Sequence, residues 1–129
     1  MRSGFTFSML ALAFVLLGCG GSSRGLDPEL ATRASEFMRA AAARDSQRVQ
    51  QLAVDERALE SVQWFWKYDS TLLQQASDYG LHPSSVMRQQ DTTSIRWPVS
   101  NERNAKVLSL LAVRQSTGWR MVSLVVVPQ

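Results

Sequence analysis

The apolar pattern of this chain changes its period part-way along, and this change limits the possible folds more than any other feature. Before Gly80, apolar residues recur at the three- and four-residue spacing of amphipathic helices. After Ser84, β-branched and aromatic residues fill several short runs that predict antiparallel strands. Helices followed by strands indicate an α+β fold, in which N-terminal helices pack on a C-terminal antiparallel sheet of about four strands.

The first helix is predicted to begin at Asp27-Pro28-Glu29, because an N-cap acceptor there precedes a proline at the first helical position. Asp45, Asp55 and Asp69 are predicted to cap three further helices, the last of which ends at Gly80. The apolar stripe of the first helix consists of Leu30, Ala34, Phe37, Met38 and Ala41.

The segment Val62–Tyr68 is open to two interpretations. Val62 and Trp66 fit a helix, but apolar residues at every second position also fit a strand. We favour a helix, because residues 56–60 immediately before it are strong helix formers.

Four strands are predicted in the second half of the chain, and Pro98 places the second of them at an edge or a bulge. A four-residue connection, Gln115–Gly118, makes the last two strands a hairpin. The predicted strands are Val86–Gln90, Thr93–Val99, Lys106–Arg114 and Trp119–Val127.

Both faces of this terminal hairpin are apolar, whereas a sheet with one wet face alternates apolar and polar residues. In its first strand Leu108, Leu110 and Ala112 lie on one face, and Val107, Leu111 and Val113 lie on the other. In its second strand we expect Val122, Leu124 and Val126 to oppose Met121, Val125 and Val127. We therefore expect helices to cover one face and a second copy of the chain, or an internal element, to cover the other. The sequence leaves open whether the Leu108/Leu110 face or the Val107/Leu111 face forms this homodimer contact.

The N-terminal residues resemble a bacterial lipoprotein signal. A short basic start and the apolar run Phe5–Leu17 precede Leu16-Leu17-Gly18-Cys19, which resembles the lipobox. The run is too short for a comfortable transmembrane helix, which needs about 20 apolar residues. The resemblance implies a signal peptide at residues 1–18, a lipidated Cys19 with a Gly/Ser tether at residues 19–26, and a single domain at residues 27–129. An ordinary signal peptide or an uncleaved anchor is the alternative.

In that family the lipidated cysteine anchors the protein in a membrane. The residue after Cys19 is Gly20, and not the aspartate that would oppose sorting to the outer membrane. The resemblance therefore implies an outer-membrane protein of the cell envelope that faces the periplasm. As a Gly/Ser coil the tether reaches only ~15 Å in r.m.s. terms, so we expect the domain to lie near its membrane.

Composition narrows the possible partners and cofactors. The formal net charge is +3, and the basic residues are scattered, so we expect no nucleic-acid partner. Because Cys19 is the only cysteine and His82 the only histidine, we expect no metal site, and no motif calls for a cofactor.

The helix-then-sheet order resembles the nuclear-transport-factor-two-like cone fold of ketosteroid isomerases and polyketide cyclases. Phe37–Asp45 resembles the group's helix that ends in a small-residue-Asp turn, and Thr117–Val122 resembles its last strand. Members often pair sheet to sheet, and catalytic members generally hold a carboxylate, histidine or tyrosine inside the cavity.

The candidate pocket or interface consists of large aromatic residues, which combine apolar surface with polar tips. They are Trp64, Trp66, Tyr68, Tyr79 and Trp97, and the plainer interpretation is that they fill the core. No catalytic residue is assigned, because the predicted strands hold no interior Asp or Glu. We therefore expect a lipid-anchored, non-catalytic domain that binds a partner protein or a small apolar ligand. One alternative is an isomerase- or cyclase-like enzyme that uses Tyr68, Asp69, Asp78 and Tyr79. Another is a purely structural homodimer.

Overall fold

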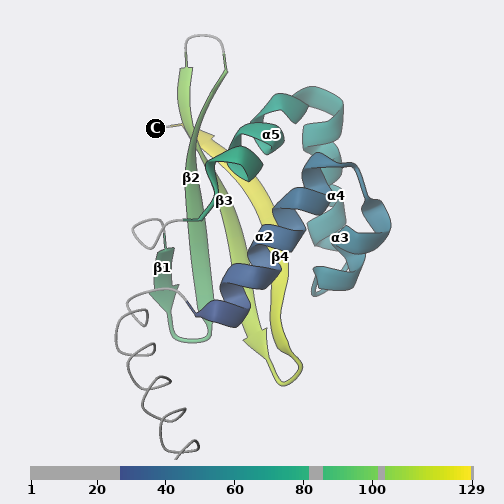
Figure 1. Ribbon diagram of the computed structural model, residues 1–129, viewed down its shortest axis with the longest axis vertical. Helices are drawn as coiled ribbons and strands as arrows, with labels where there is room; N and C mark the ends of the chain where they lie inside the picture. The colour runs from purple at the N-terminus through teal and green to yellow at the C-terminus, as the bar shows by residue number, and fades with distance from the viewer. Residues whose placement is uncertain (1–26, 82–85, 102–103, 129) are drawn as a thin grey trace, which may run out of the picture.

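The computed structural model describes residues 27–81, 86–101 and 104–128. Within them four helices precede four strands, and the helices lie to one side of a single sheet (Figure 1). The α+β fold predicted from the change of period is therefore confirmed. The predicted signal peptide, Cys19 and tether lie outside the described residues, as does His82. The elements are α2 (Pro28–Ala42), α3 (Ser46–Leu52), α4 (Glu56–Tyr68), α5 (Ser70–Tyr79), β1 (Val86–Gln89), β2 (Thr92–Asn101), β3 (Asn104–Gln115) and β4 (Gly118–Pro128).

Aspartate side chains cap three of the four described helices, as their sequence positions predict, whereas Asp69 lies at the N-cap position of α5 but its side chain makes no capping hydrogen bond. The Asp27 carboxylate accepts the Glu29 N–H at 2.8 Å at the start of α2. Asp45 and Asp55 accept a main-chain N–H in the same way at the starts of α3 and α4. Each carboxylate satisfies a donor that the first turn of a helix leaves without an intrahelical partner.

The whole of Glu56–Tyr68 forms one helix, so the favoured interpretation of Val62–Tyr68 is confirmed. Its buried residues Ala58, Val62 and Phe65 recur at helical spacing and form one stripe. Burial of this stripe decides between the two periods that the aromatic residues allow.

The strands form an antiparallel sheet in the order β1-β2-β3-β4. The short strand β1 begins at Val86, which pairs with Ile95 of β2, and it ends at Gln89, which pairs with Thr92. Around Pro98 the described residues therefore place only β3 beside β2, which makes this stretch a local edge. Proline is tolerated at such an edge because it has no N–H to donate.

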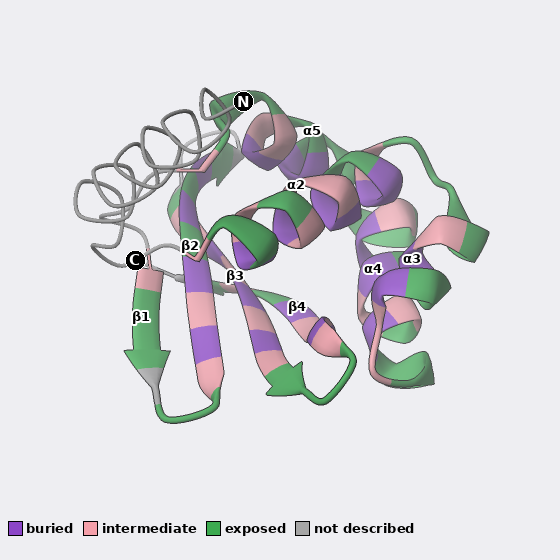
Figure 2. Ribbon diagram, turned by 60° about the horizontal axis from the view of Figure 1, so that its bottom comes forward, coloured by how far each residue is buried: buried purple, intermediate pink, exposed green. Residues whose placement is uncertain are grey.

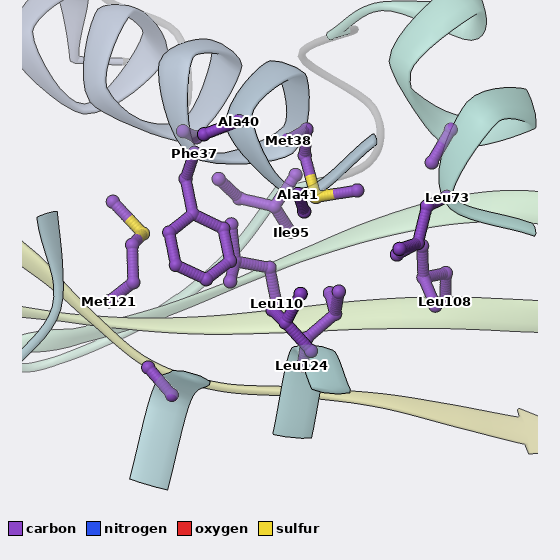
Figure 3. Close-up of a cluster of buried hydrophobic side chains, with 14 of the residues drawn as sticks. Phe37, Met38, Ala40, Ala41, Leu73, Ile95, Leu108, Leu110, Met121 and Leu124 are labelled. Carbon is purple, nitrogen blue, oxygen red and sulfur yellow. The ribbon is translucent and has the colours of Figure 1, made fainter. Parts of the chain in front are cut away.

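The core lies between the helices and one face of the sheet. Buried and less buried residues alternate along β2 and β3, and the buried ones face the helices (Figure 2). Figure 3 shows Phe37 of α2 reaching toward Leu110 and Met121 on the strands below it. Both Phe37 and Leu110 have no exposed surface. The Leu108/Leu110/Ala112 face of the hairpin is therefore the core face.

The last hairpin differs in two ways from its prediction. Gln115 pairs with Gly118, so the connection is two residues long and not four. In addition, a β-bulge interrupts the ladder between Leu111 and Ala112: they pair with Ser123 and Met121, which leaves Val122 as the extra residue. Because of this extra residue, the alternation of side chains between the two faces of β4 shifts by one position at Val122. Met121 therefore shares the core face with Leu124, and the expected grouping of Val122 with Leu124 is wrong.

The outer edge of β4 is partly closed by the chain between α3 and α4 and by α4 itself. The Val54 N–H donates to the Met121 carbonyl at 2.8 Å, and Ala53 forms a parallel bridge with Met121. Further along, the Leu124 N–H donates to Ser61 Oγ of α4 at 3.0 Å. These bonds join α4 firmly to the edge of the sheet.

The face of the sheet opposite the helices has no described element packed against it (Figure 2). Val107, Leu111 and Val113 of β3 lie on this open face and are partly exposed. On β4 the open face carries Val125 and Val127, which are 47 % and 41 % exposed. That a second copy or an internal element covers this face stays a prediction.

Candidate functional site

An open groove of about 490 Å³ runs between α4 and β4. One wall is the exposed stripe of α4, whose members are spaced three and four residues apart as one helical face requires. The other wall is β4, where Val125 lies on the open face of the sheet. The lining residues are Arg57, Glu60, Ser61, Trp64, Phe65, Leu124, Val125 and Val126.

Aromatic side chains form the apolar part of this α4–β4 groove. Trp64 is 47 % exposed, and its ring meets Phe65 edge-on with centroids 5.0 Å apart. Tyr68, one turn further along α4, lies 5.3 Å from Trp64 and is 62 % exposed. Large apolar side chains that stay in water beside one another mark interaction sites more often than isolated ones do. Trp64 and Tyr68 are thus two predicted site residues that the fold brings together.

Of the two charged side chains that line the groove, Arg57 is paired with an opposite charge and, among the described residues, Glu60 is not. Arg57 donates from both Nε and Nη2 to the Asp55 carboxylate, with the shortest contact 2.8 Å. Hydrogen bonds from the Arg57 side chain and main chain hold the pKa of Asp55 below its usual value. The Glu60 carboxylate has no hydrogen bond or ion pair within the described part of the chain. The groove therefore presents an unneutralised negative charge next to its aromatic wall.

Two other predicted site residues fix the helices in place. Trp66 lies on another face of α4, and its Nε1–H donates to the Ala41 carbonyl of α2 at 2.7 Å. Trp97 is 1 % exposed, and its Nε1–H donates to the Gly80 carbonyl at 2.9 Å. Each indole buries its apolar body and satisfies its one donor. The core-filling interpretation therefore describes both residues well, although Trp97 also lines a small cavity of about 120 Å³ between α2 and α5.

Tyr79 and the aspartates of the enzyme alternative do not join the groove. Tyr79 is 47 % exposed at the end of α5. Asp69 accepts a hydrogen bond from Thr71 Oγ1 at 3.1 Å, and Asp78 accepts one from Gln74 Nε2 at 2.9 Å. Asp69, Asp78 and Tyr79 line neither the groove nor the small cavity.

A wider hollow of about 610 Å³ lies between α2, α3 and the start of β4. Its charges are largely occupied with one another: Arg33 pairs with Glu29 at 3.4 Å, and Arg48 pairs with Glu36 at 3.0 Å. Arg120 bonds the Gln51 carbonyl. These contacts tie α2, α3 and β4 together at the surface and leave little unsatisfied charge.

Glu60, Val125 and Val126 are site residues that sequence reasoning missed. The spacing of Arg57, Glu60 and Trp64 does put them on one helical face, and this signal was present in the sequence. Their proximity to β4 depends on the packing of α4 against the edge of the sheet, which no local pattern encodes.

Comparison of the chain with known protein families, with characterised proteins and with solved structures finds no match. Within residues 27–81, 86–101 and 104–128, no three His, Cys, Asp or Glu side chains are grouped so as to hold a metal ion. No described helix is both long and apolar enough to cross a membrane.

Proposed function

We propose that this chain is a lipid-anchored protein of the bacterial envelope whose domain binds a partner protein through the α4–β4 groove and catalyses no reaction. The observation that carries the proposal is the groove itself. It combines exposed Trp64 and Val125 with the unpaired carboxylate of Glu60 on two rigid elements. Sites on rigid helices and strands hold their geometry better than sites on loops.

The make-up of the core favours binding over catalysis. Catalytic groups in a cone-like fold would line the space between helices and sheet, where burial shifts their pKa. Among the described residues that space holds apolar side chains and Thr93. Tyr68 and Tyr79 of the enzyme alternative are 62 % and 47 % exposed, so neither lies in that space. We propose that the domain shares the cone-like architecture without its chemistry.

The anchor is tested separately from the groove. Replacing Cys19 with alanine should abolish incorporation of labelled fatty acid and leave either an unprocessed precursor or a protein released from membranes. The physical reason is that the acyl chains, each contributing about 0.8 kcal/mol per buried methylene, supply the membrane affinity. Unchanged labelling and membrane fractionation of the Cys19→Ala variant would remove the lipoprotein proposal.

The binding role is tested in living cells with a photo-reactive phenylalanine analogue placed at Val125. Irradiation should produce a discrete adduct with a second protein, identified by mass spectrometry. The same analogue at Tyr79, which is equally exposed but outside the groove, is the matched control. Equal adducts at both positions, or none at Val125, would contradict a groove-specific partner.

A second candidate is a structural homodimer through the open face of the sheet. It is favoured by the partly exposed Val107, Leu111 and Val113, which no described element covers. Exposed Arg96 of β2 pairs with Ser109 in the ladder and lies on the same face, where it opposes close approach of a second copy. For this reason we place the groove first. In the photo-crosslinking experiment an adduct of the chain with itself would favour the homodimer.

A further inference from the structure

The charge of the groove indicates the sign of its partner. Arg57 and Asp55 neutralise each other through a two-pronged contact, so neither offers a free charge. Glu60 remains, and its carboxylate is solvent-exposed beside Trp64. Because charges across an interface are usually complementary, the partner is expected to place a cationic group opposite Glu60.

The aromatic wall suits the same partner. A lysine or arginine is attracted to the face of a tryptophan or tyrosine ring, and its aliphatic stem packs on apolar surface. This chain already contains one such contact, with Lys67 Nζ 5.3 Å from the centroid of the Tyr68 ring. Val125 and the partly exposed Val126 complete a surface on which a neighbouring apolar side chain can lie.

The position of the groove argues against a lipid surface as its occupant. Glu29 of the first turn of α2 lies against Gly118 at the start of β4, which marks where residues 19–26 join the domain. Val126 is eight residues further along β4, or roughly 25 Å at the rise of a strand. If Cys19 is lipidated, as the proposed function holds, the point where the anchored segment joins the domain lies near the opposite end of β4 from Val126.

The edge of β4 indicates how the partner is held. Two of its main-chain positions, Met121 and Leu124, already bond to Val54 and Ser61. Pro128 has no N–H to offer further along. A partner strand would find these positions of the edge occupied, so we expect side-chain contacts to supply most of the affinity.

We propose that the groove docks a segment of a partner protein in which a large apolar side chain neighbours a lysine or arginine. This inference rests on the proposed function and specifies its partner. The apolar side chain packs on Trp64 and Val125, and the cation pairs with Glu60. The contact area is small, so a short segment alone binds weakly and the whole partner binds more tightly.

The probe is a short synthetic peptide, acetyl-Ser-Leu-Lys-Leu-Lys-Ser-amide, and its counterpart with both lysines replaced by glutamate. Each is titrated into the full-length, isotopically labelled chain in non-ionic micelles. The lysine peptide should shift the indole N–H signal of Trp64 and the amide signals of residues 124–126 to saturation. The glutamate peptide should bind more weakly by up to about fivefold, the upper end of the range expected for one exposed charge pair.

Variants separate the two contacts. Glu60→Gln should remove the preference for lysine while keeping the leucine-dependent shifts, and Glu56→Gln should change nothing, because Glu56 lies outside the groove. Trp64→Ala should abolish binding of both peptides, with Tyr79→Ala as its control. All four side chains are exposed, so the variants should fold. Equal affinity for both peptides, an equal effect of Glu56→Gln, or no shift at Trp64 would each overturn the inference. If the crosslink at Val125 is still groove-specific in that case, the proposed function stands. Only the chemistry inferred for the partner is then refuted.

Discussion

Two polar side-chain atoms lie in the core without a hydrogen-bond partner in the described part of the chain. They are Thr93 Oγ1 and Trp119 Nε1, and both residues are at most 2 % exposed. A buried donor that lacks a partner costs free energy that an apolar group of the same shape would not. Thr93 is the simpler of the two to test, because valine has almost the same shape.

Thr93→Val should leave the free energy of unfolding unchanged or raise it by about 1 kcal/mol. The measurement is denaturant unfolding at neutral pH, with Thr92→Val as the control. Thr92 is partly exposed and its side chain lies on the opposite face of β2, so the control should show no gain. A loss of stability in Thr93→Val would mean that the hydroxyl is bonded after all.

The contact between Asp55 and Arg57 predicts a small acid-dependent term in stability. Because the contact lowers the pKa of Asp55 in the folded state, its contribution is complete above the ordinary carboxyl pKa of about 4. It is lost as the pH falls through the lower folded-state value. The melting temperature of the wild type should therefore fall more steeply below about pH 4 than that of Asp55→Asn. If the melting temperatures of the two proteins fall equally steeply below about pH 4, the contact does not contribute to stability in this way.

Residue types alone could not separate the site tryptophans from the structural ones. Trp64 and Trp66 are two positions apart in the sequence, yet one is in the groove and the other bonds α2. A helix turns about 200° over two residues, so their opposite roles follow once α4 is known to be helical. Which of the two faces water depends on where α2 packs, and that is tertiary information.

At the scale of elements, the β1–β2 turn contains a residue in an unfavourable conformation. Gln90 has φ +52°, whereas its neighbour Asp91 has no positive φ, as in hairpin turns that prefer glycine at the first central position. A side chain with a Cβ is strained in this region, and glycine is not.

Gln90→Gly should raise the free energy of unfolding by about 0.5–1 kcal/mol, because relief of the strain exceeds the entropy that glycine adds to the unfolded chain. The measurement is thermal unfolding, and Gln90→Ala is the control that keeps the strain. Arg44 also has a positive φ, but its guanidinium donates to the Trp66 carbonyl, which makes it a less clean test. A less stable glycine variant would contradict the prediction.

The caps and the helices were predictable because their signals are local. Asp27, Asp45 and Asp55 each act within two or three residues of their own position. The bulge at Val122 was not predictable, since one extra residue leaves no mark in an apolar run where every position suits a strand. The residues that form the groove were missed for a different reason, because their proximity depends on how α4 packs against β4.

At the scale of the molecule, the two faces of the sheet differ in what they tolerate. Leu110→Lys places a charge in the core, where Leu110 has no exposed surface, and should prevent folding. Leu111→Lys lies on the open face and should fold. If copies pair through this face, Leu111→Lys should also convert a dimer to a monomer.

Light scattering on the full-length chain in micelles, with circular dichroism to monitor folding, checks both variants. A wild type that is monomeric at high concentration would refute dimerisation through this face. A folded Leu110→Lys variant would contradict the assignment of the core face.

The partly closed edge of β4 would have a consequence for copies anchored in one membrane, as we propose for this chain. Anchored proteins are confined to two dimensions, so neighbours meet far more often than the same number of molecules free in solution. A fully open strand edge would let such neighbours add to one another in register and grow into fibrils. The bonds from Val54 and Ser61, together with Pro128, remove part of that template. On a shared membrane, crowding would therefore raise the density of exposed grooves while offering neighbouring chains less of the β4 edge to pair with.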